Sequence, residues 1–123
     1  MVNCAEGKGF EMVSTGNVFY ADVGIQYLGI NVFDIPQAQI SAHFHECANF
    51  IDKAIEEGGR VLVHCFVGMS RSATIVISYL MIKRRMSSEE ALRTVRRHRE
   101  IRPNDGFLRQ LLALESKLSR EWL

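Results

Sequence analysis

Hydrophobic and polar residues alternate in blocks along this chain, and the blocks predict short buried strands followed by longer helices. Runs rich in β-branched and other apolar residues at positions 2–5, 26–32 and 61–63 are typical of buried strands. The run at 61–63 is expected to lie fully buried in a parallel sheet. The segment 6–24 shows no clear period, so we expect it to run over the surface with at most a short helix near residues 19–22.

Apolar residues at helical spacing predict two helices in the middle of the chain. Ser41 is expected to cap the first helix, which runs to about Glu57 and is ended by Gly58 and Gly59. The inward face of this helix is expected to hold Phe44, Cys47, Ala48, Ile51, Ala54 and Ile55. The second helix covers 73–82, an apolar stretch broken only by Thr74, Ser78 and Tyr79, which is long enough for a central helix.

Two further helices are predicted in the last third of the chain. Residues 87–90 fit a capping box that opens a helix to about Arg99, and Pro103 stops it. Its expected inward residues are Ala91, Leu92 and Val95. Asn104 or Asp105 then starts a final helix. The apolar face of the final helix is expected to comprise Phe107, Leu108, Leu111, Leu112, Leu114 and Leu118.

This succession of strands and helices predicts an α/β fold. We expect one domain over residues 1–123, with a central, mostly parallel sheet of about four strands flanked by helices. The second strand, the helix from Ser41 and the strand at 61–63 would form a βαβ crossover. Such a unit brings the carboxyl ends of both strands to one rim of the sheet, where α/β proteins place their sites.

Composition places the chain among ordinary globular proteins. The sequence is 47% hydrophobic and 24% charged, and it carries three cysteines without paired spacing. Neither a disulfide framework nor a zinc site is therefore supported, and we expect a reducing compartment and no metal or other cofactor. The longest apolar run is too short to span a bilayer and no secretory signal opens the chain, so we expect a cytoplasmic and/or nuclear location without membrane contact.

Charge is unevenly distributed, although the net charge is only +1. Residues 1–60 hold three Lys or Arg against eight acids, a net of −5, whereas residues 83–102 hold eight against three, a net of +5. A basic face could steer an acidic or multiply phosphorylated substrate. The same charges would also suit solvated helix faces and helix ends, and both interpretations stay open.

The stretch 61–74 carries the candidate chemistry. A buried strand is followed by a tight loop that starts at Cys65, and a helix begins close to Arg71. Free backbone N–H groups and the helix dipole make such a loop suited to a phosphate-like dianion. The same field, with the Arg71 cation, favours a thiolate and makes Cys65 a candidate nucleophile. For Cys4 and Cys47, burial as small hydrophobes is favoured over a redox partnership with Cys65.

The nine residues His64-Cys65-Phe66-Val67-Gly68-Met69-Ser70-Arg71-Ser72 resemble the active-site signature of the cysteine-dependent protein phosphatases, most closely the small atypical dual-specificity group. The resemblance extends over nearly the whole chain. Other matching segments are Asn3-Cys4-Ala5-Glu6-Gly7, Tyr27-Leu28-Gly29-Ile30, the segment around Asp34, and Arg102-Pro103-Asn104-Asp105-Gly106-Phe107. It implies the phosphatase fold and a dual-specificity catalytic domain.

The resemblance also implies roles for individual residues. Cys65 would attack phosphorus, Arg71 would bind the phosphate bidentately, and Asp34, at a strand's carboxyl end, would be the general acid. Ser72 would stabilise the departing thiolate, and His64 would hold the loop. The expected substrate-binding residues are Phe66, Val67, Gly68, Met69, Ser70, Arg71 and Arg99, the last for a second phosphate or acidic side chain.

The uncharged loop side chains Phe66, Val67 and Met69 favour phosphoproteins over inositol phosphates, for which lysines would be expected. We therefore expect phosphorylated protein substrates, with phosphotyrosine and phosphothreonine both accepted, and no nucleic acid partner. Members of the resembled group carry a further strand and helix before Val2. The chain is thus expected to be shortened, leaving residues 2–5 as an exposed edge strand prone to self-association.

Two alternatives from other classes remain. One is a catalytically weak or inactive module that binds phosphoproteins, which the shortened N-terminus would favour and the combination of Cys65, Arg71 and Asp34 argues against. The other is a thiol enzyme that uses the same loop for arsenate reduction or sulfur transfer. That chemistry calls for resolving cysteines near the loop, and none is visible.

Overall fold

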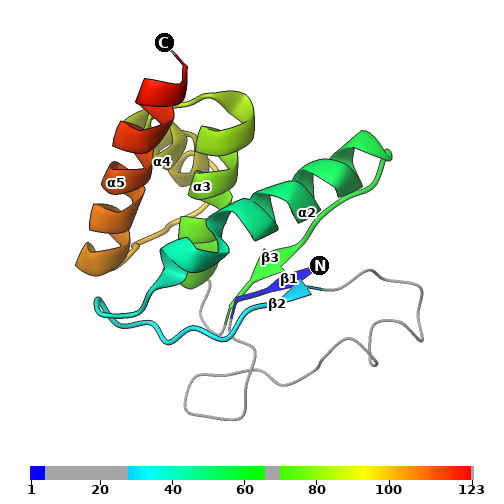
Figure 1. Cartoon of the computed structure of the whole chain (residues 1–123). Helices are drawn as coiled ribbons and strands as arrows, with labels where there is room; N and C mark the ends of the chain where they lie inside the picture. The colour runs from blue at the N-terminus through cyan, green and yellow to red at the C-terminus, as the bar shows by residue number, and fades with distance from the viewer. Residues whose placement is uncertain (5–27, 66–69, 123) are drawn as a thin grey trace.

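The computed structural model describes residues 1–4, 28–65 and 70–122. It contains three strands, β1 (Val2–Asn3), β2 (Leu28–Gly29) and β3 (Val63–His64), and the helices lie together on one side of them (Figure 1). A 3-10 helix, η1 (Ile40–His43), leads directly into α2 (Phe44–Glu56). The remaining helices are α3 (Arg71–Arg84), α4 (Ser88–Arg96) and α5 (Asp105–Glu121).

The sheet has the order β2-β1-β3, and both neighbours run parallel to β1. Val2 lies level with Leu28 on one side and with Val63 on the other. The expectation that residues 2–5 form an exposed edge is therefore wrong. Val2 and Cys4 are fully buried, and backbone hydrogen bonds tie this segment to both neighbours, so its described residues do not form the exposed edge on which the expectation of self-association rested.

β2 and β3 are shorter, and more exposed to solvent, than their apolar composition predicts. Of the predicted strand 26–32 the described part is extended only at Leu28–Gly29, although Ile30 and Val32 beyond it are buried. β3 is half-buried and Leu62 before it is 56% exposed, because β3 stands at the side of the sheet among the described strands. An expected sheet of about four strands is thus described here as three, and the predicted helix near 19–22 lies outside the described residues.

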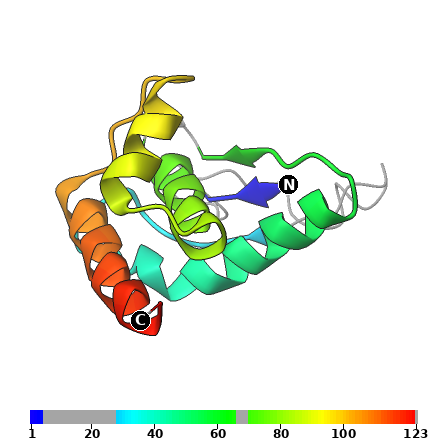
Figure 2. The same cartoon turned by 90° about the horizontal axis from the view of Figure 1, so that it is seen from above.

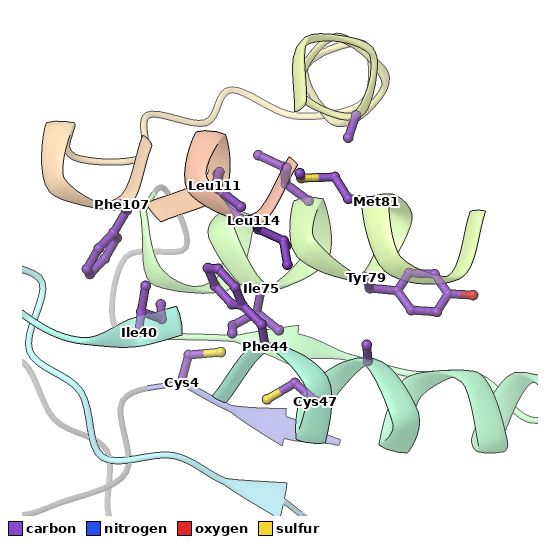
Figure 3. Packing of buried hydrophobic residues seen from close by; sticks show 14 of the residues in the cluster. Cys4, Ile40, Phe44, Cys47, Ile75, Tyr79, Met81, Phe107, Leu111 and Leu114 are labelled. Carbon is purple, nitrogen blue, oxygen red and sulfur yellow. The ribbon is translucent and has the colours of Figure 1, made fainter. Parts of the chain in front are cut away.

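The predicted central helix is α3, which contacts β3, α2, α4 and α5 (Figure 2). Figure 3 shows how Phe44 of α2, Ile75 of α3 and Leu111 and Leu114 of α5 meet in one cluster. Because α3 is covered on several sides, apolar residues all around the helix suit it better than a one-sided stripe. In the described part of the chain, no helix combines the length and the apolar character needed to cross a bilayer.

Helix ends agree with the sequence at several points and differ at others. The Ser87 hydroxyl caps α4 and the Asn104 side chain caps α5, each by accepting an N–H three residues later. Gly58, with a φ of +82°, closes the end of α2. By contrast, Ser41 does not cap α2, because it lies inside η1, and its backbone N–H donates to Gln110.

One predicted helix end and two predicted buried positions are wrong. The third predicted helix ends at Arg96, three residues before Arg99. Ile55 and Leu112, both expected on inward faces, are 39% and 54% exposed. Ile51 of α2 and Leu111 of α5 are buried as predicted. The apolar residues of each helix therefore extend beyond the face that packs against the rest of the protein.

Candidate active site

The start of α3 brings the candidate nucleophile into contact with two groups of one residue. The backbone N–H of Ser72 donates to the Sγ of Cys65 at 3.4 Å, and the Ser72 Oγ lies 3.4 Å from the same sulfur. Cys65 is half-buried, directly after β3, and Ser72 is buried in the first turn of α3. An N–H in the first turn of a helix has no partner within the helix, so it is available to stabilise negative charge on sulfur.

Polar burial is concentrated at this helix. Among the described residues, the buried polar or charged side chains are Ser70, Arg71, Ser72, Thr74 and Ser78, all in α3 or at its N-cap. Burying polar groups costs free energy unless they find partners. Here Thr74 Oγ1 donates to the Ser70 carbonyl at 2.7 Å, and Ser70 Oγ accepts the backbone N–H of Asn104 at 3.1 Å. The polar start of α3 is therefore built into the interior.

Arg71 is 2% exposed, and its Nη1 donates to the backbone carbonyl of Val32 at 3.1 Å. Val32 stands two residues before Asp34. The hydrogen bond joins the start of α3 to the segment that follows β2, so the two parallel strands deliver their ends to one region, as the crossover predicted. A planar guanidinium is the group that binds a phosphate bidentately, and here one of its nitrogens is held by the Val32 carbonyl.

Asp34 is exposed in the segment between β2 and η1. Its Oδ1 accepts a hydrogen bond from the side-chain Nδ2 of Asn104 at 2.9 Å. Phe33 and Ile35, its apolar neighbours in the chain, are 52% and 47% exposed. The sequence around Asn104 predicts only the start of a helix, because its partner Asp34 lies 70 residues away in the chain.

The other predicted site residues divide into two groups. Phe66, Val67, Gly68 and Met69 lie outside the described residues, whereas Ser70 lies at the start of α3 next to Arg71. His64 is half-buried in β3, and its role in holding the loop stays a prediction. Arg99 is exposed just beyond α4, with its backbone N–H donating to the Val95 carbonyl at 3.2 Å.

The remaining two cysteines are fully buried, and none of the three cysteines forms a disulfide. Burial raises the pKa of Cys47 to about 12, with a smaller contribution from the Glu46 carboxylate. Burial also raises the pKa of Cys4 well above its usual range. The neighbouring Cys47 and Cys65 add to this pKa increase, whereas Arg71 opposes it. Cys4 and Cys47 are thus held as neutral thiols at physiological pH.

Among the described residues, no group of three or more His, Cys, Asp or Glu side chains is arranged to hold a metal ion. The groups at this site whose chemistry suits a phosphate ester are the Cys65 sulfur, the Arg71 guanidinium and the Asp34 carboxyl group. Cys65 directly follows a strand, Arg71 begins a helix, and Asp34 lies in an exposed segment between two elements.

Comparison with known proteins relates this arrangement to one family. Residues 1–117 match the family model described as "Dual specificity phosphatase, catalytic domain". The chain is 52% identical over 100 residues to dual specificity protein phosphatase 26 of Bos taurus, covering 80% of this chain and 47% of that protein. It is 48% identical over 122 residues to dual specificity protein phosphatase 13B of Homo sapiens, covering 98% of this chain and 61% of the relative.

The likeness extends to three dimensions. The crystal structure of human DUSP28 superposes with a TM-score of 0.81 at 31% identity, covering 96% of this chain and 74% of that one. The chain spans less than two thirds of the length of the two relatives above.

Proposed function

Because the chain belongs to the dual specificity phosphatase catalytic-domain family, we propose that it hydrolyses phosphotyrosine and phosphoserine or phosphothreonine in proteins through a phosphocysteine intermediate. The family membership confirms the resemblance seen in the sequence. The observation that carries the proposal is the pair of contacts between Cys65 Sγ and Ser72, made at the start of the helix that also carries Arg71.

The first chemical step is transfer of the phosphoryl group to sulfur. The substrate phosphate lies over the start of α3, where Arg71 and backbone N–H groups offset its negative charge. The Cys65 thiolate attacks phosphorus, an S–P bond forms, and the P–O bond to the substrate breaks. Asp34 gives its proton to the leaving oxygen, so that tyrosine or serine departs as a neutral hydroxyl group.

The second step restores the enzyme. Asp34, now a carboxylate, takes a proton from a water molecule that attacks phosphorus, and the S–P bond breaks. The electron pair returns to Cys65, and the Ser72 hydroxyl and N–H stabilise the thiolate as it leaves. Inorganic phosphate is released. The contacts at 3.4 Å between Ser72 and Cys65 Sγ support this role for Ser72.

Substrate selection rests on surfaces around the acid. Phe33 and Ile35, which precede and follow Asp34 in the chain, expose apolar area that would suit an aromatic ring or the apolar neighbours of a phosphoresidue. Arg99 and the exposed cations of α4 would attract a second phosphate or acidic side chains. Phosphorylated proteins are therefore the proposed partners, and the cytoplasmic and/or nuclear location stays a prediction.

A non-catalytic phosphoprotein-binding module is not favoured. A protein that only binds phosphate needs the backbone N–H groups and the arginine. It does not need a nucleophilic sulfur in contact with a helix N–H, or a carboxyl group at the same edge of the sheet. A thiol enzyme for arsenate reduction or sulfur transfer would need a second reactive cysteine. Cys4 and Cys47 are buried, with raised pKa values, and do not meet that need.

The proposal is tested by steady-state turnover of p-nitrophenyl phosphate, measured with and without EDTA. A phosphatase with this site turns the ester over in both conditions, because the proposed mechanism involves no metal. A binding module or a sulfur-transfer enzyme would give no turnover. Activity that disappears with EDTA and returns on addition of a metal would contradict the proposed mechanism.

A further inference from the structure

Asn104 makes three hydrogen bonds in three directions. Its side-chain Oδ1 accepts the backbone N–H of Phe107 at 2.9 Å, which caps α5. Its backbone N–H donates to Ser70 Oγ at 3.1 Å, at the start of α3. Its side-chain Nδ2 donates to Asp34 Oδ1 at 2.9 Å. One half-buried residue thus connects the first turn of α5, the N-cap of α3 and the candidate general acid.

The first two turns of α5 also hold the chain that follows the acid. Gln110 Nε2 donates to the Ala38 carbonyl at 2.8 Å, and Gln110 Oε1 accepts the Ser41 backbone N–H at 2.9 Å. Gly106 lies so close to Pro36 that a Cβ there would overlap the Pro36 backbone. We call this contact between residues 34–41 and 104–110 the acid seat. It fixes the backbone on which Asp34 stands.

We propose that Asn104 is a positioning residue for proton transfer by Asp34. This inference rests on the proposed function, because it matters only if Asp34 donates a proton. Asp34 is exposed, and an exposed carboxyl group on a connecting segment samples several rotamers unless a partner selects one. Asn104 selects the rotamer in which Oδ1 faces its amide.

The direction of the hydrogen bond from Asn104 to Asp34 also determines which carboxyl oxygen of Asp34 carries the acidic proton. An amide Nδ2 can only donate, so Oδ1 of Asp34 acts as the acceptor, and in the acid form the proton is carried by Oδ2. Proton transfer in a phosphoryl-transfer step requires the acid oxygen within hydrogen-bond reach of the leaving oxygen. By holding Oδ1, Asn104 leaves Oδ2 to serve as the donor to the substrate.

The capping role and the positioning role can be separated by substitution. Capping needs a side-chain acceptor, and Ser and Asp both cap helices about as well as Asn. Neither supplies the amide donor that faces Asp34, and an Asp at this place would set a second carboxylate against the first. Asn104→Ser and Asn104→Asp should therefore keep the cap of α5 and lose the contact that orients the acid.

The test compares turnover of two aryl phosphates that differ in leaving group, phenyl phosphate and p-nitrophenyl phosphate. The p-nitrophenolate leaves without protonation, whereas phenolate needs the acid. We expect Asn104→Ser to lower kcat for phenyl phosphate about tenfold and kcat for p-nitrophenyl phosphate far less. Asn104→Asp should show at least the same selective loss. Thermal melts would establish that each variant is folded.

Two further variants complete the comparison. Asn49→Ser makes the same chemical change on an exposed position of α2 and should leave both rates unchanged. Asp34→Asn is the reference for complete loss of the general acid, and it gives the largest selective decrease in kcat to be expected for phenyl phosphate. If Asp34→Asn is selective for phenyl phosphate while both folded Asn104 variants are not, Asn104 has no positioning role. If Asp34→Asn itself shows no selectivity, or the wild type turns over neither ester, the assignment of Asp34 fails and this inference with it.

Discussion

The buried guanidinium of Arg71 donates from Nη1 to the backbone carbonyl of Val32 at 3.1 Å. The bond joins two segments 39 residues apart, one that starts α3 and one that leads to Asp34. A buried hydrogen bond with a charged donor contributes more to stability than one between neutral groups. Removing either partner leaves the other buried without a hydrogen bond, which costs free energy. Arg71, the proposed phosphate-binding residue, is therefore tied to the segment that carries Asp34, the proposed general acid.

Asp34→Asn should lower kcat for phosphotyrosine peptides by about 10²-fold, because it removes the general acid. The loss should shrink for aryl phosphates with better leaving groups, which depart without a proton. Steady-state kinetics over a series of aryl phosphates would measure it, with Asp52→Asn on α2 as the matched control. An equal loss across leaving groups would mean that Asp34 only shapes its loop.

Gly106→Ala should destabilise the protein by about 1–3 kcal/mol, because the added methyl group overlaps the backbone of Pro36 and forces the acid seat apart. The same displacement moves Asp34, so kcat for phenyl phosphate should fall as well. Urea denaturation and turnover would measure both effects, with Ser119→Ala on the exposed face of α5 as the control. A stable, fully active Gly106→Ala protein would show that the close approach is not required.

Arg99→Ala should raise KM for doubly phosphorylated peptides more than for singly phosphorylated ones, since it removes a cation away from the reacting centre. The change should weaken at high salt because Arg99 is exposed. Lys117→Ala, which removes a cation from α5, is the control. Equal weakening of both peptides would reduce the role of Arg99 to a general electrostatic field.

Alkaline pH should lower the free energy of unfolding through the buried thiols. The pKa of Cys47 rises from 9.0 to about 12 on folding, so the folded state keeps the proton that the unfolded state loses. Stability from this thiol is complete below about pH 9 and falls by up to about 1.4 kcal/mol per pH unit above it. Cys4 acts in the same direction.

The contribution of Cys47 can be isolated by comparing slopes. Urea unfolding at several values between about pH 8 and pH 10.5 should give a shallower decline for Cys47→Ala than for the wild type, whatever the substitution costs at neutral pH. Identical slopes would show that the Cys47 thiol ionises equally in the folded and unfolded states.

Local patterns in the sequence predicted much of this fold. The capping residues Ser87 and Asn104, the end of α2 at Gly58 and the central position of α3 all follow from signals within a few residues. The contact of Cys65 with Ser72 also joins close neighbours in the chain, and the signature around it predicted both residues. Short-range chemistry of this kind can be inferred without coordinates.

Long-range relationships could not be predicted in the same way. The order of the strands depends on which neighbour pairs with β1, and apolar composition alone does not choose between an edge and a centre. The acid seat joins residues about 70 positions apart, and Asn104 gives no local sign that its amide faces Asp34. Gly106 likewise suggests only a helix start until Pro36 is placed against it.

The most direct test of the account is to trap the phosphoenzyme. Wild-type protein and Cys65→Ser are mixed with a radiolabelled phosphotyrosine peptide, quenched in acid and digested, and the labelled fragment is identified by mass spectrometry. The account predicts label on Cys65 in the wild type, and neither label nor turnover in Cys65→Ser, while that variant still binds the peptide. Turnover by Cys65→Ser, or wild-type turnover with no phosphoryl group on Cys65, would contradict a cysteine-based mechanism.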